Sequence, residues 1–582
     1  METPYLNRIS SPQDIKTMSS EELNALAEEM RYGIIHRTNL IGGHFGPDLG
    51  IVEATIALHV VFDSPKDKMI FDVSHQCYPH KMLTGRKDGY LDPENHRITG
   101  YTSPQESEHD LFTIGHTSTS VSLACGVAKA RDLKGEKYNV IAIIGDGSLS
   151  GGEALEGLSA GGVLGGNLIV VVNDNEMSIS PTNGGLYKGL AELRRTKGAS
   201  ANNMFTFMGY DYLYVEDGND IDAMIAAFRK VKDSSSPVVL HIHTLKGKGY
   251  APAVENKEPY HWIMPGEVDN GLQRGLSEFD KITTRYLLEQ KAKGEPVVAV
   301  TPATAGICGF TPEFRAAMGA HYTDVDICEQ HAVGYISGLA ANGAKPVLPI
   351  MSSFLQRSYD QLSQDLAINK APATILVIWG GISGSDVTHL TLFDIPLVAN
   401  IPNIVYLAPT TTEEYEAMLD WSVHQTEHPV AIRVPNAPHS CGAKDTTDYS
   451  VLNTYKMTRK GSKVALIGAG NFYWLAEQTA EALKARFGFE PTLINPVYLT
   501  GTDKVMLESL KADHDIVITL EDGCTAGGFG EMIAAYYGGS DMKVLVYGAD
   551  KEFTDSVPLA ELYQRYHLTP ELIADDIAPL LG

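Results

Sequence analysis

The sequence predicts an α/β fold of three doubly wound domains, each with a parallel sheet between layers of helices. A chain of 582 residues is too long for a single hydrophobic core and indicates three or four domains. Apolar, strand-like runs alternate with helix-like segments along it, which is typical of parallel sheets. Gly- and Asp-rich stretches follow two successive runs, at the sheet edge where such folds bind ligands.

The first block, residues 1–285, contains one clear β-α-β crossover. Its two strands are predicted over residues 140–144 and 168–172, with a helix-like opening over 151–158 between them. A last strand is predicted over 238–244. A charged, helix-like stretch over 282–293 either closes this block or links it to the next.

Two further blocks follow, over residues 295–440 and 455–582, joined by a polar linker over 438–447. Helix-like segments alternate with the strands, which again favours parallel sheets. The strands expected in the second block lie over 296–301, 344–350, 374–378, 403–407 and 430–433, and those of the third over 463–467, 515–519 and 543–547.

Composition excludes several classes of function. The formal net charge of −26 argues against nucleic acid and anionic membranes as partners, because phosphate binding needs basic surface. The six cysteines contain no Cys-x-x-Cys pair, so neither a zinc site nor a disulfide framework is indicated. With no basic-then-apolar N-terminus and no apolar run of about 18 residues, neither a signal peptide nor a transmembrane helix is expected. We therefore expect a reduced, cytoplasmic compartment.

The most informative motif is Gly145-Asp-Gly147 after one strand, answered by Asn173-Asp-Asn175 after the next. Asp146 and Asn175 are 29 positions apart, and both follow strands of one crossover, so they are expected at the same sheet edge. Asp146, the Asn175 amide and the Met177 carbonyl are oxygen ligands of the kind that Mg²⁺ shares with phosphates. An Asp between glycines is by itself more often a turn, but the pair at this spacing resembles the thiamine diphosphate signature.

A thiamine diphosphate enzyme also needs a buried carboxylate for the aminopyrimidine ring. Glu329, before the small-residue stretch 334–341, is the candidate, although a carboxylate at a helix start is also favoured by the helix dipole. Phe354 could stack on that ring, or simply belong to the core. Several histidines in predicted loops could move protons near neutral pH, namely His44, His75, His116, His261 and His389.

These motifs together resemble the 1-deoxy-D-xylulose-5-phosphate synthase family. The resemblance is carried, in the family's order, by Gly42-Gly-His44, Asp72-Val-Ser-His-Gln-Cys-Tyr-Pro-His-Lys81, Gly115-His-Thr-Ser-Thr-Ser120, Gly145-Asp-Gly147, Asn173-Asp-Asn-Glu-Met-Ser-Ile-Ser180, Glu329-Gln-His-Ala-Val333 and Phe354-Leu-Gln-Arg357. It implies a transketolase-like homodimer with diphosphate-binding, pyrimidine-binding and C-terminal domains. The implied reaction joins the two-carbon unit of pyruvate, after loss of CO₂, to D-glyceraldehyde 3-phosphate, a step of isoprenoid and thiamine biosynthesis.

The resemblance also implies roles for individual residues. Mg²⁺ is expected on Asp146, Asn175 and the Met177 carbonyl. The expected cofactor contacts are His75, His116, Gly147, Ser148, Asn175, Ile179, Glu329 and Phe354. The expected catalytic residues are Glu329, His44, His389, Asp386 and, with lower weight, His261, and the expected substrate contacts are His44, His75, Arg357, Asp386 and His389.

The chain departs from the family where the acceptor's phosphate is expected to bind. Met351 stands where the family has Tyr, and Trp379 and Asn436 stand where it has Arg. Neither replaces a bidentate Arg–phosphate contact, although Arg357 remains and Arg433 is near in sequence. The loop between Asp386 and His389 and the stretch over 180–207 are also shorter than in the family. We therefore keep open a non-phosphorylated or otherwise different aldehyde acceptor.

Three other interpretations remain. A transketolase would use the same cofactor without releasing CO₂ from pyruvate. A non-catalytic relative would be expected to lack Glu329, Asp146 or Asn175, all of which are present. A dinucleotide site at Gly468-Ala-Gly470 is weakly indicated, because Tyr473 stands where the third glycine of Gly-x-Gly-x-x-Gly belongs.

Overall fold

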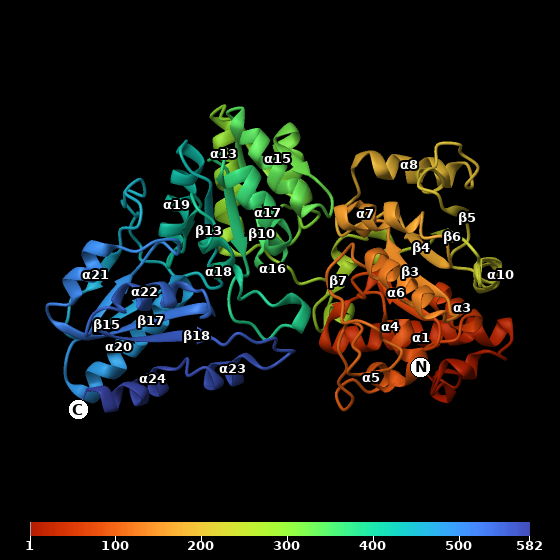
Figure 1. Cartoon of the computed structure of the whole chain (residues 1–582), viewed down its shortest axis with the longest axis horizontal. Helices are drawn as coiled ribbons and strands as arrows, with labels where there is room; N and C mark the ends of the chain where they lie inside the picture. Colours follow the sequence, from red (N-terminus) through yellow and green to blue (C-terminus); the bar gives the residue numbers. More distant parts are fainter. Residues whose placement is uncertain (1, 582) are drawn as a thin grey trace. The chain divides into compact units, whose positions relative to one another are not determined.

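The computed structural model describes residues 2–581 (Figure 1). The chain divides into two compact units, Met1–Gly275 with Asp326–Cys328, and Leu276–Val325 with Glu329–Gly582.

The first unit is built on a parallel sheet whose strands run in the order β2-β3-β4-β6-β5. Strands β3 and β4 are the predicted crossover pair, and both are buried almost throughout. The strands are β2 (Lys68–Phe71), β3 (Val140–Gly145), β4 (Leu168–Asp174), β5 (Asp211–Val215) and β6 (Pro237–His243).

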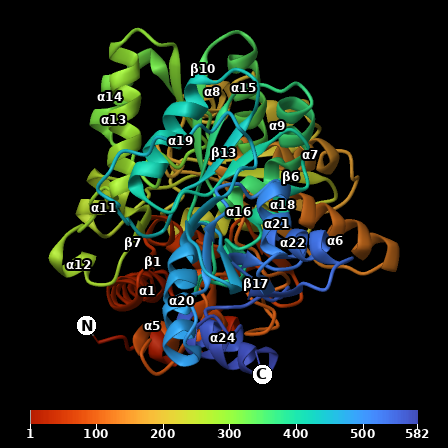
Figure 2. The same cartoon turned by 90° about the vertical axis from the view of Figure 1, so that its left-hand side faces the viewer.

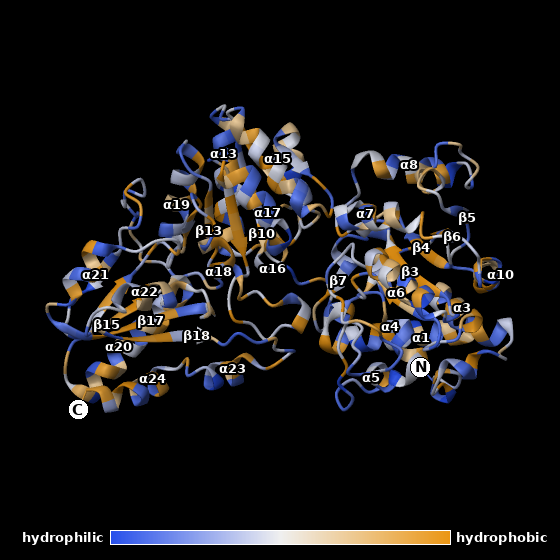
Figure 3. Ribbon diagram, in the orientation of Figure 1, coloured by the Kyte–Doolittle hydropathy of each residue, from blue (hydrophilic) through white to orange (hydrophobic). Residues whose placement is uncertain are grey.

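Both faces of this sheet are covered, so its strands read as continuous apolar runs. Alternate residues of β3 enter different cores: Ile141 and Ile143 pack with helices α1, α3 and α10, whereas Ala142 and Ile144 pack with α6, α7 and α8. Figure 3 shows these strands as hydrophobic ribbons. The covering helices are α1 (Ser20–Ile41), α3 (Val52–Val61), α6 (Ser120–Lys134), α7 (Gly152–Gly161), α8 (Gly184–Arg195) and α10 (Ile221–Val231).

Short elements complete this unit. A two-stranded antiparallel sheet pairs β1 (Gly43–His44) with β7 (Trp262–Ile263), which places His44 opposite Trp262. The remaining helices are α2 (Gly46–Gly50), α4 (Tyr78–Lys81), α5 (Asp88–Leu91), α9 (Met204–Phe207), α11 (Ala251–Glu255) and α12 (Glu267–Asn270).

The second unit begins with a parallel sheet in the order β12-β13-β11-β10-β8-β9. Its strands are β8 (Val297–Thr301), β9 (Tyr322–Asp324), β10 (Lys345–Met351), β11 (Thr374–Ile378), β12 (Val405–Leu407) and β13 (Val430–Arg433). Its helices are α13 (Glu278–Ala292), α14 (Pro312–Met318), α15 (Glu329–Ala341), α16 (Ser352–Leu355), α17 (Tyr359–Gln361), α18 (Asp394–Ala399) and α19 (Thr412–His424).

A third sheet, in the order β14-β16-β15-β17-β18, follows in the same unit and is parallel except for β14. Figures 1 and 2 both show α24 beside α20, where the two helices pack. The strands are β14 (Lys456–Arg459), β15 (Lys463–Gly468), β16 (Thr492–Asn495), β17 (His514–Cys524) and β18 (Lys543–Ala549), and the helices are α20 (Tyr473–Phe487), α21 (Lys504–Leu510), α22 (Phe529–Tyr537), α23 (Leu559–Arg565) and α24 (Pro570–Ile577).

The charged helix expected over 282–293 begins earlier than predicted. Helix α13 starts at Glu278, because the Ser277 side chain accepts from the Asp280 amide and the Asp280 carboxylate accepts from the Ser277 amide. It belongs to the second unit, where it packs on β8 and α19. The division into domains over 1–285, 295–440 and 455–582 stays a prediction.

Two further observations bear on compartment and membrane. All six cysteines are free thiols. Across residues 2–581, none of the helices combines the length and apolar character needed to cross a bilayer.

Candidate active site

The strand ends of the first unit bring the predicted cation ligands together. Gly145, the last residue of β3, pairs with Asn173 of β4, and the Asp146 amide donates to the Asn173 carbonyl at 3.1 Å. Asp146 and Asn175 are both buried. Within residues 2–581, Asp146 Oδ2 and Asn175 Oδ1 accept no hydrogen bond.

Two buried acceptor oxygens without donors are costly, by roughly 1–3 kcal/mol each. Burial, with the nearby Asp174 carboxylate, raises the pKa of Asp146 well above its usual value. A bound cation would satisfy both oxygens and hold Asp146 ionised, so the residues present fit Mg²⁺. No cluster of three or more His, Cys, Asp or Glu suited to a metal occurs in the described residues. Asp146, the Asn175 amide and the Met177 carbonyl would therefore need phosphate and water oxygens to complete the shell.

The loop carrying His116 is tied to the same edge. The amides of Ser118 and Ser120 donate to the buried Asp72 carboxylate at 2.7 and 2.9 Å. The Ser118 hydroxyl donates to the Ser148 carbonyl at 2.8 Å, and a Cβ on Gly151 would collide with that hydroxyl oxygen at 2.1 Å. These hydrogen bonds join the loop of His116 to the loop of Gly147 and Ser148, so the three predicted cofactor contacts lie in two loops that are bonded to each other. Ile179 lies in the loop that follows Asn175.

Three predicted histidines form a cluster in the first unit. The ring centroids of His44 and His75 are 4.9 Å apart, and each lies 5.5 Å from the ring of His261. The pairing of β1 with β7 brings His44 and His261 together. Burial, and then the charge of Lys246, lower the pKa of His261 well below its usual value. His261 therefore belongs with the other two.

Lys246 is a residue that sequence reasoning missed. It is buried, its Nζ donates to the Ser178 carbonyl at 2.7 Å, and the same atom lies 3.1 Å from His261 Nδ1. Burial lowers the pKa of Lys246 to about 7. The only signal was a lysine before a glycine directly after a strand, in Lys246-Gly-Lys-Gly-Tyr250. Tyr101, whose ring lies 5.8 Å from that of His44, carried none.

In the second unit, Glu329 is the first residue of α15 and is buried. Its Oε2 accepts no hydrogen bond from residues 2–581 and lies 3.6 Å from Arg357 Nη1. Burial raises the pKa of Glu329, against the opposing charge of Arg357. A buried carboxyl group with a raised pKa is the kind of group that can exchange a proton with a bound ligand.

Phe354, Asp386 and His389 also lie together. The rings of Phe354 and His389 are 5.9 Å apart, and His389 Nδ1 lies 3.3 Å from Asp386 Oδ1. Asp386 caps the short 3₁₀ helix Val387–His389 by accepting from the Thr388 amide at 2.9 Å. Burial acts to raise the pKa of Asp386, but His389 and Thr388 outweigh it and hold it below its usual value.

The two arginines that could replace the family's phosphate-binding residues, Arg357 and Arg433, already have carboxylate partners. Arg433 is buried between Asp394, with Nε at 2.6 Å, and Asp522. Trp379 is 53% exposed and has a left-handed backbone (φ 59°), and the Asn436 side chain donates to the Gly380 carbonyl at 3.0 Å. Met351 is buried at the end of β10.

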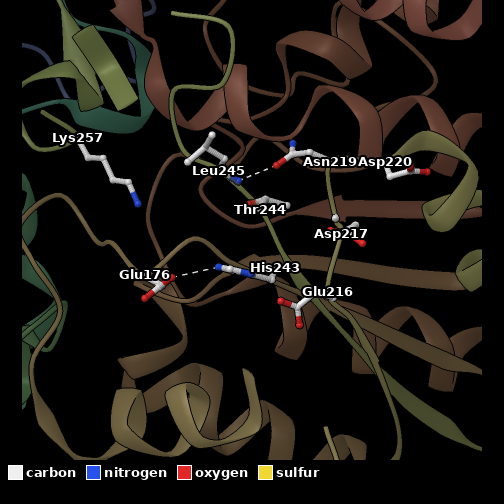
Figure 4. Close-up of a pocket in the computed structure, with 10 residues that line it drawn as sticks. Glu176, Glu216, Asp217, Asn219, Asp220, His243, Thr244, Leu245 and Lys257 are labelled. Carbon is white, nitrogen blue, oxygen red and sulfur yellow. Dashed lines mark hydrogen bonds and ion pairs between the residues drawn. The ribbon is translucent and has the colours of Figure 1, made fainter. Parts of the chain in front are cut away.

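A pocket of about 430 Å³ opens in the first unit beside the loop that contains Asn175, Glu176 and Met177 (Figure 4). Glu176 and His243 line it together with Lys257. None of the residues predicted to act in catalysis lines it.

Comparison with known proteins agrees with the motifs. A family model described as 1-deoxy-D-xylulose-5-phosphate synthase matches residues 6–202 and 194–244, the transketolase pyrimidine-binding domain matches 280–437, and the transketolase C-terminal domain matches 453–573.

Curated relatives match along nearly the whole chain. The 1-deoxy-D-xylulose-5-phosphate synthase of Clostridium beijerinckii is 35% identical over 619 residues, covering 99% of both chains. That of Carboxydothermus hydrogenoformans is 37% identical over 612 residues, covering 98% of both. A solved transketolase from Campylobacter jejuni is 16% identical, with a TM-score of 0.43, over 97% of this chain and all of its own. The chain belongs to the 1-deoxy-D-xylulose-5-phosphate synthase family.

Proposed function

We propose that this chain uses thiamine diphosphate and Mg²⁺ to join the two-carbon unit of pyruvate, after decarboxylation, to an aldehyde. The observation that carries the proposal is the pair of buried oxygens without donors, Asp146 Oδ2 and Asn175 Oδ1, at neighbouring strand ends. Membership of a family whose relatives are named 1-deoxy-D-xylulose-5-phosphate synthase supports the same reaction.

Asp146, Asn175 and the Met177 carbonyl would hold Mg²⁺. Thiamine diphosphate, when bound, supplies the electron sink for decarboxylation and carbon–carbon bond formation. Its expected contacts are His75, His116, Gly147, Ser148, Asn175, Ile179, Glu329 and Phe354. Among them, Glu329 would exchange a proton with the aminopyrimidine, which its buried position and raised pKa support.

Proton movements at the substrates would fall to the histidines. His44, His75 and His261 form one cluster, which would place three imidazoles beside the reacting carbons. His389 is oriented by Asp386, as a general acid–base usually is by a carboxylate. Arg357 would contact the substrate from beside Glu329.

The acceptor is either glyceraldehyde 3-phosphate or a non-phosphorylated or otherwise different aldehyde. Arg433 already lies between two buried carboxylates, and Trp379 and Asn436 carry no charge, which favours the unphosphorylated class. We further propose a cytoplasmic homodimer.

The test is CO₂ release from pyruvate by the purified protein with Mg²⁺ and thiamine diphosphate, with and without glyceraldehyde 3-phosphate. Release stimulated most by that aldehyde supports the synthase named in the relatives. Release stimulated more by unphosphorylated aldehydes supports the alternative acceptor. Absence of release, with two-carbon transfer between sugar phosphates, would indicate a transketolase, and absence of both a non-catalytic relative.

A further inference from the structure

The loop with the proposed cation ligands contains a backbone conformation that its own sequence does not favour. Glu176 lies between Asn175 and Met177 with φ 64°, in the left-handed region that residues other than glycine rarely adopt. The orientation of Glu176 sets the direction of both neighbours. The placement of the Asn175 amide relative to the Met177 carbonyl therefore depends on the conformation of Glu176.

Side chains from two other elements hold Glu176 in place. Arg194 Nη2, on α8, donates to Glu176 Oε2 at 3.2 Å. His243 Nε2, at the end of β6, lies 3.1 Å from Glu176 Oε1, and Figure 4 shows this second contact. The Glu176 amide donates to Asp174 Oδ1 at 3.2 Å. Both ends of the residue are therefore fixed.

Arg194 also contacts Asp174, the residue that precedes Asn175. Its Nη1 donates to Asp174 Oδ2, which lies 2.9 Å from His241 Nε2. Asp174 is fully buried, so its carboxylate is a fixed point for the guanidinium. One arginine thus bridges Asp174 and Glu176, on either side of Asn175.

The back of the loop is fixed as well. The Thr244 hydroxyl donates to Asn173 Oδ1 at 2.5 Å, and Lys257 Nζ donates to the Asn175 carbonyl at 3.2 Å. Both residues line the pocket of Figure 4. The contact that α8 adds to these is the bridge from Arg194 to Asp174 and Glu176.

Helix α8 offers an internal comparison. Leu190 and Leu193 anchor it in the core. Arg194 is 16% exposed and faces the loop, whereas its neighbour Arg195 is 72% exposed and pairs with Glu192 of the same helix. The two residues share a chemistry and a helix turn, but only Arg194 contacts the loop.

We propose that Arg194 is a positioning residue for the cation site, acting through Asp174 and Glu176 to keep Asn175 and the Met177 carbonyl aimed at one ion. This inference rests on the proposed function of Asp146 and Asn175. Residues that orient metal ligands without touching the metal typically contribute about 10–100-fold to metal affinity.

The test measures binding of Mn²⁺, as a probe for Mg²⁺, by electron paramagnetic resonance with thiamine diphosphate present. R194A is expected to weaken Mn²⁺ binding roughly 10–100-fold and to change the zero-field splitting of the bound ion. R195A, the matched control, leaves both unchanged, and R194K recovers part of the affinity.

The outcomes separate this inference from the function on which it rests. If wild type itself binds no Mn²⁺ with thiamine diphosphate, the proposed function is wrong. If wild type binds and R194A binds equally well, or R194A loses only thermal stability, the positioning role is wrong. Should R194A fail to fold, E176Q is the second variant, because Glu176 is half-exposed and pairs with Arg194. E176Q is expected to weaken Mn²⁺ binding as well. Unchanged affinity in E176Q would overturn the inference.

Discussion

Two buried carboxylates at strand ends, Asp146 in the first unit and Asp522 in the second, differ in what surrounds them. Asp146 Oδ2 has no hydrogen-bond donor in residues 2–581. Asp522 accepts from Arg433 and, at 2.7 Å, from Asn471. One oxygen of Asp146, Oδ2, is thus left for an outside ligand, whereas the oxygens of Asp522 are paired within the fold. A buried carboxylate is therefore evidence for a ligand site where one of its oxygens lacks a hydrogen-bond partner within the protein, and not where both oxygens are paired.

The largest expected effect falls on Glu329, the buried carboxylate at the start of α15. E329Q is nearly isosteric but cannot exchange a proton, so kcat should fall roughly 10³-fold, within the range for general acid–base groups. The melting temperature should change little, because glutamine fills the same space and the ion pair lost with Arg357 is a long one, at 3.6 Å. Steady-state kinetics and calorimetry test both expectations. Near-normal kcat would remove Glu329 from the mechanism.

Substitution in the ion-paired cluster of Arg433, Asp394 and Asp522 should instead affect stability. R433L leaves Asp394 and Asp522 buried without their cation, so the free energy of unfolding should fall by about 3–5 kcal/mol. Urea denaturation measures this, with R285L as the control because Arg285 pairs with Glu416 at the surface. Equal stabilities of the two variants would contradict a structural role for Arg433.

Replacing Asp146 should cost ligand binding rather than folding. With Mg²⁺ and thiamine diphosphate at about 100 times their dissociation constant, wild type should gain about 2.7 kcal/mol of stability, and D146N should gain almost none. Without ligands, D146N should be no less stable than wild type, because a buried, unpaired carboxylate is removed. Thermal shifts with and without ligands check this. A D146N protein that still gains stability from the ligands would show that the cation lies elsewhere.

The smallest expected effect concerns the acceptor. W379R places a guanidinium at the end of β11, where a charge-assisted bond to phosphate should raise kcat/KM for glyceraldehyde 3-phosphate over unphosphorylated glyceraldehyde by at least about tenfold. W379L is the control for loss of the indole. If wild type already prefers the phosphorylated aldehyde and W379R changes nothing, the acceptor does not reach Trp379.

Sequence predicted the long, buried strands well and missed several short strands, both at sheet edges and inside a sheet. Strands β3 and β4 were evident because both faces are buried, giving unbroken apolar runs. Strand β5, half-exposed at the sheet edge, was missed because burial on one side leaves no such run. The short β2 and β9 and the strands β14 and β16 were missed as well.

The same limit applies to the site. Asp146 and Asn175 could be paired from one crossover, since topology fixes where both strands end. The proximity of His44, His75 and His261 could not, because it depends on the pairing of β1 with β7. Nothing in the sequence around Lys246 indicates that its ammonium is buried.

The central claim is that the orphaned oxygens of the first unit hold a cation. A crystal structure with Mn²⁺ and thiamine diphosphate, recorded at the manganese absorption edge, tests it directly. We expect one anomalous peak within coordination distance of Asp146 Oδ2, Asn175 Oδ1 and the Met177 carbonyl. An ordered cofactor with no peak there, or with the ion bound by other residues, would contradict it.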